Sequence, residues 1–134
     1  MSQTPVLQYT IPLAFDAAEQ AVREALQAQG FGILTEVDVT AVLRAKLGVE
    51  TPRHKLLGAC NPVLANASLT AAPEVGAFLP CGVAIRAGET EESTIAALQN
   101  PALLGELFGV PELLTPASEA AEPCAMRSAR PRIP

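Results

Sequence analysis

The chain changes abruptly from a strand pattern to a helix pattern at Cys60-Asn61-Pro62. The preceding run, His54–Cys60, is short and largely apolar, which is typical of a buried strand. Asn61 suits the N-cap of a helix, and Pro62 suits its first helical position, where a backbone N–H would be unpaired in any case. A strand that passes directly into a helix predicts a fold of short elements, with a candidate site at this junction.

Similar patterns mark the other elements. The predicted strands are residues 6–11, 31–37, 54–60, 81–86 and 93–98; the predicted helices are residues 15–29, the run between Asp38 and Gly48, residues 62–71, and a short run after Asn100-Pro101. The polar run 88–92 makes the last two strands an antiparallel hairpin. This order predicts an α+β fold: a two-layer sandwich with a mixed, mostly antiparallel sheet of about five strands and helices packed on one face.

The length of 134 residues suits one domain. We expect residues 1–116 to form it. From residue 117 the chain loses its periodicity, and residues 117–134 are predicted to be a C-terminal segment that is irregular or disordered at its end. Only 4% of residues are aromatic and Trp is absent, so the core must be built from Leu, Val, Ile and Ala.

The surface is predicted to be weakly charged and partly apolar. Hydrophobic residues make up 49% of the chain and charged residues only 17%. Apolar surface on this scale is commonly covered by a partner subunit, so we expect a homodimer.

The charge balance argues against nucleic-acid binding. The net charge is −5, and three of the nine basic residues, Arg127, Arg130 and Arg132, lie in the last residues of the chain. Without them, six basic residues face fourteen acidic ones, and a charge near −8 repels phosphates.

The three cysteines, Cys60, Cys81 and Cys124, are odd in number and show no CxxC spacing. They are therefore expected to be reduced thiols rather than a disulfide framework or a zinc site. No segment resembles a signal peptide or approaches the roughly 20 apolar residues of a membrane span. We expect a soluble cytoplasmic protein that needs no membrane.

Several motifs, taken in order, resemble one family. They are residues 30–38 (Gly-Phe-Gly-Ile-Leu-Thr-Glu-Val-Asp), residues 57–62 (Leu-Gly-Ala-Cys-Asn-Pro) followed by Ala65, and Leu79-Pro80-Cys81. Together they are similar to the bacterial domain of unknown function family 302, over roughly residues 6–110. The resemblance implies a small α+β domain, often a homodimer, with no established activity. The family's usual C-terminal amphipathic helix is interrupted here by Pro123.

Cys60 is the candidate catalytic residue. A thiol next to a helix N-terminus can have a lowered pKa and act as a nucleophile. The alternative is that Cys60 is a small buried apolar residue, as free cysteines often are. If the third and fourth strands pair, Cys81 lies nearby, and either a redox pair or two core cysteines would result.

The candidates for ligand binding are Cys60, Asn61, Glu36 and His54. Asn61 could present its amide to a ligand, although an N-cap role already explains it. Glu36 and Asp38 could share a strand face and do acid–base chemistry, or be a solvent-facing residue and a helix cap. His54 could be a general base or a surface histidine at a strand edge.

No nucleotide-binding, serine-hydrolase or zinc-protease motif is present, and no cofactor is implied. We expect a non-enzymatic homodimeric domain that binds a small ligand or a protein partner. The alternative is a thiol-based enzyme or redox sensor that uses Cys60, assisted by His54 or Glu36. A metal site formed by Cys60, Cys81 and His54 is a third hypothesis, less favoured because metal ligands usually lie closer in sequence.

Overall fold

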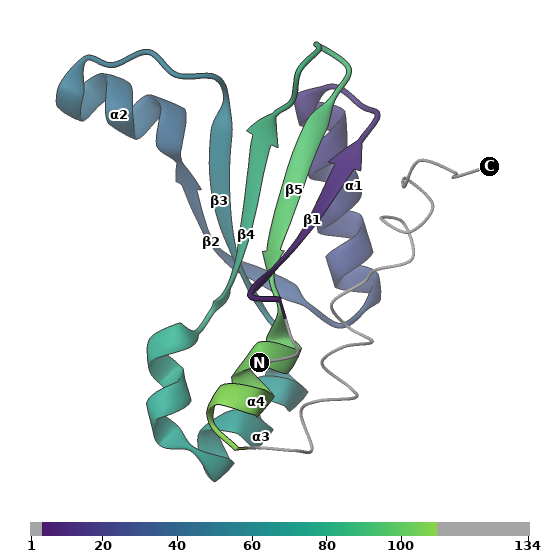
Figure 1. Cartoon of the computed structure of the whole chain (residues 1–134), viewed down its shortest axis with the longest axis vertical. Coiled ribbons are helices and arrows are strands. Elements are labelled where there is room, and N and C mark those ends of the chain that lie inside the picture. The colour runs from purple at the N-terminus through teal and green to yellow at the C-terminus, as the bar shows by residue number, and fades with distance from the viewer. Residues whose placement is uncertain (1–3, 110–134) are drawn as a thin grey trace.

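The computed structural model describes residues 4–109, and every predicted element is present in them (Figure 1). The elements are β1 (Val6–Ile11), α1 (Phe15–Ala28), β2 (Gly32–Asp38), α2 (Val39–Leu47), β3 (His54–Cys60), α3 (Pro62–Ala71), the 3-10 helix η1 (Pro73–Phe78), β4 (Cys81–Ala87), β5 (Thr94–Gln99) and α4 (Pro101–Leu107). The segment 117–134, predicted to be irregular, lies outside the described residues.

The five strands form one sheet in the order β1-β5-β4-β3-β2, and all four neighbouring pairs are antiparallel. The predicted α+β class and the β4–β5 hairpin are confirmed. The sequence allowed a mixed sheet. The structure is antiparallel throughout because α2, and then α3 with η1, return the chain at the ends of the sheet instead of crossing over a face.

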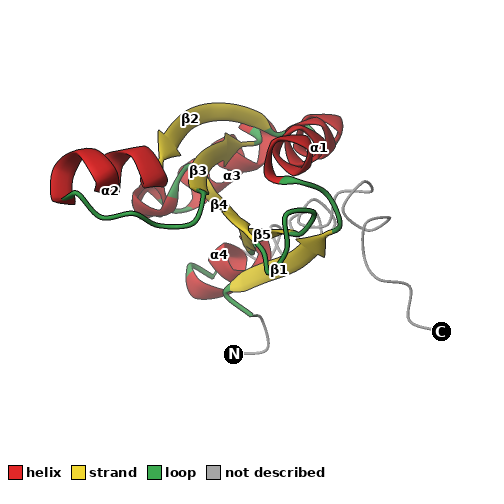
Figure 2. Cartoon of the chain, turned by 90° about the horizontal axis from the view of Figure 1, so that it is seen from above, coloured by secondary structure: helices red, strands yellow, loops and turns green. Residues whose placement is uncertain are grey.

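One face of the sheet is covered by α1 (Figure 2). The apolar stripe of α1 is buried as its spacing predicts, with Ala18 and Val22 fully enclosed. The main core consists of residues from this helix and from all the strands except β2, and it includes Tyr9, Ile11, Phe15, Leu26, Phe31, Leu57, Ala59, Val83, Ile85, Ala96 and Leu98. The two layers of the predicted sandwich are therefore the sheet and α1.

The remaining helices lie at the ends of the sheet (Figure 1). A second, smaller core lies at one end of the sheet. It consists of Ala72, Val75 and Ala102, from η1, α4 and their flanks, and Cys81 packs against it. At the other end α2 projects beyond the strands and buries none of its residues. The prediction of helices packed on one face thus holds for α1, while the short helices cap the sheet instead.

The predicted helix ends are present in atomic detail. The Asp38 carboxylate accepts a hydrogen bond from the Ala41 N–H at 3.0 Å. Asn61 Oδ1 accepts from the N–H groups of Val63 and Leu64 at 3.0 and 3.2 Å. Gly48 ends α2 in the left-handed conformation, with φ of 66°. Local capping chemistry therefore sets where these helices begin and end.

A β-bulge interrupts the outer strand β2. The register with β3 shifts between Ile33 and Thr35, and the extra residue, Leu34, is 65% exposed. A bulge of this kind bends the strand and increases its twist. The free edge of the sheet at β2 is therefore irregular.

Candidate functional site

Among residues 4–109, no helix layer covers the face of the sheet opposite α1 (Figure 2). We call this surface the open face. Because successive residues of a strand alternate between the two faces, it is formed by Val6, Gln8, Thr10, Thr35, Val37, His54, Leu56, Gly58, Cys60, Gly82, Ala84, Arg86, Ile95, Ala97 and Gln99. Leu56 is 40% exposed and Val6 49%, so large apolar side chains on this face meet solvent.

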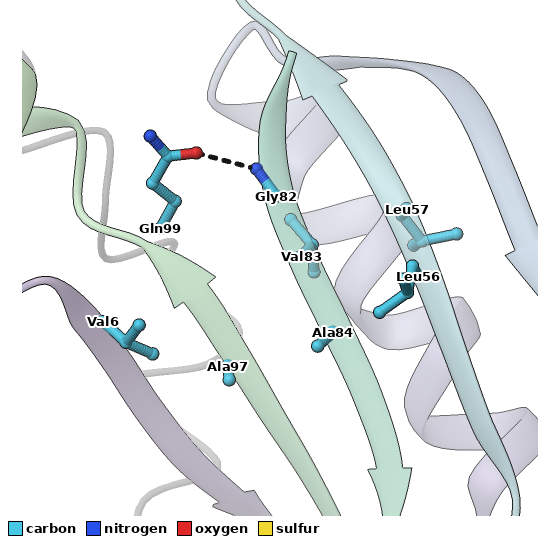
Figure 3. A pocket seen from close by; sticks show the side chains of 8 residues that line it. All are labelled: Val6, Leu56, Leu57, Gly82, Val83, Ala84, Ala97 and Gln99. Atoms are coloured by element: carbon cyan, nitrogen blue, oxygen red, sulfur yellow. Dashed lines mark hydrogen bonds between the residues drawn. The ribbon is translucent and has the colours of Figure 1, made fainter. Parts of the chain in front are cut away.

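A hollow of about 280 Å³ lies in the open face (Figure 3). Its floor consists of small residues on neighbouring strands, Gly82, Ala84 and Ala97, and its sides include Val6 and Leu56. A Cβ atom added at Gly82 would meet no heavy atom within 4 Å. The missing side chain at Gly82 therefore leaves open space, and small residues create the hollow.

Gln99 borders one end of the hollow. Its side-chain Oε1 accepts a hydrogen bond from the Gly82 N–H at 3.1 Å (Figure 3). The Gly82 N–H of β4 therefore has a hydrogen-bond partner, although that partner is a side chain and not the backbone of a neighbouring strand.

Two further polar residues, Arg86 and His54, lie on the same face, each two residues along its strand from Ala84 or Leu56, which line the hollow. Arg86 lies directly opposite His54 on the neighbouring strand. Its Nη2 donates to Gln8 Oε1 at 3.2 Å. His54 Nε2 is buried and has no hydrogen-bond partner within the described part of the chain. The open face thus combines an apolar hollow with cationic and hydrogen-bonding groups two residues away along the strands.

Cys60 lies at the end of β3, half-buried, as a free thiol. It pairs with Gly32, whereas Cys81 pairs with Ala59, so the Cys60 and Cys81 side chains leave opposite faces of the sheet. The predicted pairing of the two strands is present, and both cysteines are free thiols. Burial, and to a smaller degree the neighbouring Cys60, raises the pKa of the Cys81 thiol to about 11.

The structure does not bring the proposed assisting residues to Cys60. His54 is at the opposite end of the same strand, roughly 20 Å away along six residues. Glu36 pairs with Leu57, three residues before Cys60. Within residues 4–109 no three His, Cys, Asp or Glu side chains could together hold a metal ion. The metal hypothesis is therefore wrong, because strand geometry keeps Cys60 and His54 apart. For the thiol hypothesis, neither of the proposed bases, His54 or Glu36, lies beside the Cys60 thiol.

Glu36 belongs to a closed ring of four charges. Arg23 contacts Glu19 at 2.9 Å and Glu36 at 3.1 Å, and Lys55 contacts the same two carboxylates at 2.9 Å each. The hydrogen bond and charge of Lys55, and then those of Arg23, lower the pKa of the Glu36 carboxyl. A carboxylate held ionised between two cations stabilises the fold and is poorly suited to proton transfer.

Asn61 has its amide fully engaged in the fold. Its Oδ1 caps α3, and its Nδ2 lies 3.5 Å from the Gln29 carbonyl oxygen at the end of α1. Gly30 follows with φ of 86°, and a Cβ there would lie 3.2 Å from Asn61 Nδ2. The Asn61 side chain therefore joins two helix ends.

The hollow and its neighbour Arg86 were missed in the sequence. A signal was present in β4, where Gly82, Ala84 and Arg86 alternate with the buried Val83 and Ile85. Two small residues followed by a cation on one strand face could have indicated a recessed surface.

These features define a small α+β domain with an open apolar sheet face. The chain belongs to a family described as "Domain of unknown function DUF302", whose model matches residues 7–127. The match continues past residue 110, where the resemblance seen in the sequence ended.

A solved structure has the same fold. It is described as "Crystal structure of uncharacterized conserved protein DUF302 from Bacillus stearothermophilus", with a TM-score of 0.80 and 23% sequence identity, covering 96% of this chain and 100% of that chain. The comparison with curated proteins gave no match. In the part of the chain that the structure describes, no helix has the length and apolar character needed to cross a membrane.

Proposed function

We propose that this protein is a non-enzymatic domain that binds a small ligand with an apolar body in the hollow of the open face. The observation that carries the proposal is a hollow of about 280 Å³ floored by Gly82, Ala84 and Ala97. Its volume is near the lower end of the roughly 300–1,000 Å³ typical of ligand pockets. The candidate side chains Glu36 and Asn61 are already engaged in the fold, which favours binding over catalysis at those residues.

The binding test is an amide chemical-shift titration with decanol as a neutral apolar probe. Saturable shifts centred on Gly82, Ala84 and Ala97 are expected, and a Gly82→Leu variant, whose side chain would fill the hollow, should lose them. Shifts that are absent, or scattered over both faces of the sheet, would contradict ligand binding here.

We further propose that the protein is a homodimer in which α2 provides the contact. A nine-residue helix is marginal by itself in water, so α2 needs a packing partner. Yet α2 buries no residue, and Val42 (43% exposed), Leu47 (70%) and Val49 (45%) leave its apolar side uncovered. An identical α2 from a second copy would cover it in a symmetric contact.

Sedimentation velocity at micromolar concentration tests the dimer. We expect a species of twice the 13.9 kDa chain mass, and dissociation in a Leu47→Glu variant. The matched control is Ala41→Glu, which adds the same charge on the opposite side of α2. A monomeric wild-type protein would refute the dimer without affecting ligand binding.

A reducing compartment such as the cytoplasm is part of the proposal. Its support is the odd number of cysteines in the sequence and the absence of CxxC spacing, which do not suit a disulfide framework. Recovery of Cys60 and Cys81 as free thiols from intact cells, by rapid alkylation, is the expected result; recovery of either in a disulfide would contradict it.

A further inference from the structure

We infer that the ligand of the hollow is an amphipathic organic anion, with an apolar body in the hollow and a carboxylate or sulfonate group at Arg86. This inference rests on the proposed ligand binding at the open face and adds the chemical class of the ligand. It combines two neighbouring features of the surface, the hollow and the cationic Arg86.

The hollow suits the apolar part of such a molecule. Side chains facing it belong to Val6, Leu56, Ala84 and Ala97, and the polar Oε1 of Gln99 is already hydrogen-bonded to Gly82. A volume of about 280 Å³ has room for several water-sized groups. An alkyl chain therefore fits, and it would bury the exposed parts of Val6 and Leu56.

Arg86 does not line the hollow itself, but it lies two residues from Ala84 on the same face of β4. Arg86 belongs to β4, but it donates to Gln8 on β1, with β5 between them. Gln8 lies directly opposite Ala97, which is part of the floor. The guanidinium is thus held across β5, beside the hollow, and Gln8 fixes its position.

Among the described Lys and Arg residues, Arg86 and Lys46 form no ion pair with a carboxylate, and of these two only Arg86 lies on the open face. Arg23, Lys55, Arg44 and Arg53 each form an ion pair. Arg86 forms none within the described residues, and by strand alternation no Asp or Glu side chain there belongs to the open face. In a chain of net charge −5, this uncompensated cation favours an anionic ligand.

His54 is a second polar group near the hollow. It lies opposite Arg86 in the register, and its Nε2 is buried with no hydrogen-bond partner in the described structure. A buried polar atom without a partner is unfavourable. Because Nε2 is enclosed, the anionic group is proposed to bind Arg86 rather than His54.

The test uses the full chain and the fluorescent anion 1-anilinonaphthalene-8-sulfonate, displaced by decanoate or by decanol. Decanoate should compete at least about ten times better than decanol, because a hydrogen bond to a charged group contributes roughly 1.5–3 kcal/mol. Arg86→Gln should weaken decanoate by about the same factor and leave decanol unchanged. Arg44→Gln is the matched control, since it removes one arginine charge away from the open face.

Each outcome decides between the two proposals. Equal competition by decanoate and decanol, with Arg86→Gln unaffected, overturns the anion inference and leaves ligand binding intact. Equal losses in Arg86→Gln and Arg44→Gln also overturn it, because only net charge would then matter. No probe binding to wild-type protein, together with no decanol shifts, overturns both proposals. Unchanged thermal unfolding shows that each variant is folded.

Discussion

At the scale of single residues, the two described cysteines differ in environment although they lie on neighbouring strands. Cys81 contributes to the small core formed with Ala72, Val75 and Ala102. Desolvation there disfavours the thiolate, which is the reactive form. Cys60 is also half-buried, but it lies on the open face. The two thiols should therefore respond differently to an alkylating reagent.

We predict that iodoacetamide modifies Cys60 well before Cys81 in the native protein. With a pKa of about 11, Cys81 is thiolate in only about one molecule in a thousand at pH 8. Its modification should accelerate as the pH rises toward 11. Peptide mass spectrometry on a Cys124→Ser background measures both rates, and equal rates at pH 8 would contradict the prediction.

Asn61 also acts as a single residue with a defined structural role. Replacement by Ala removes the acceptor for two backbone N–H groups at the start of α3. We expect Asn61→Ala to lower the free energy of unfolding by about 1 kcal/mol. Asn66→Ala, an exposed position within the same helix, is the control in urea unfolding and should cause no loss.

At the scale of secondary structure, two glycines face each other in the sheet, and the space around them differs. Gly58 and Gly82 are direct partners on β3 and β4. A Cβ at Gly58 would collide with Thr35 Oγ1 and lie 2.6 Å from Pro80 Cγ, whereas a Cβ at Gly82 meets open space. Gly58 allows close packing, and Gly82 creates the hollow.

We predict that Gly58→Ala destabilises the protein by about 1–3 kcal/mol, because the neighbouring atoms must move. Gly82→Ala should be neutral or slightly stabilising, since Gly in a strand is less favourable than Ala. Thermal unfolding of the two variants provides a comparison at matched positions. Similar losses in both would show that the space at Gly82 is not present in solution.

Most of the secondary structure was predictable because its signals are local. The buried stripe of α1 recurs at helical spacing, and Asp38 and Asn61 cap helices within three residues of their own positions. The caps therefore placed the starts of α2 and α3. The same capping role explains why Asn61, a candidate for ligand binding, has its amide engaged within the fold.

The strand order and the open face were not predictable, because they depend on contacts between distant residues. β1 pairs with β5 across nearly the whole described chain, and periodicity along β1 does not specify a partner. Lys55 and Glu19, 36 residues apart, meet only after the sheet and α1 have packed together. Likewise Arg86 approaches the hollow only because Gln8, 78 positions away, lies on β1.

At the scale of the whole molecule, the four-charge ring links three elements. Glu19 and Arg23 belong to α1, Glu36 to β2 and Lys55 to β3. The carboxylates and cations alternate, so each charge has two opposite neighbours. The ring closes the edge of the main core where α1 meets β2, and its stabilising effect must depend on pH.

We predict that the ring stabilises the fold from about pH 4.5 to about pH 10.5, the ordinary pKa values of Glu36 and Lys55. Because the folded state lowers the pKa of Glu36, this contribution is present above 4.5 and is lost as the pH falls through the lowered value. The pKa of Lys55 is raised, chiefly by its hydrogen bonds to Glu36 and Glu19, so its contribution is lost as the pH rises through that value.

Urea unfolding of wild-type and Glu36→Gln protein checks this dependence. The variant should be less stable at pH 7, and the difference should shrink below pH 4.5 as the pH falls toward the lowered pKa of Glu36. A difference that stays constant between pH 3 and pH 7 would mean that the ring charges do not stabilise the fold. High salt should also reduce the difference, because half of the Glu36 side chain is exposed.

The bulge in β2 has a consequence for how the folded protein behaves in a crowded solution. An outer strand with regularly spaced free N–H and C=O groups can template the addition of strands from other molecules, which leads to aggregation. At β2 the displaced register around Leu34 breaks that spacing, and the charged Glu36 and Asp38 follow it. The bulge therefore protects the sheet against edge-to-edge polymerisation, even though the described residues leave one of its faces uncovered.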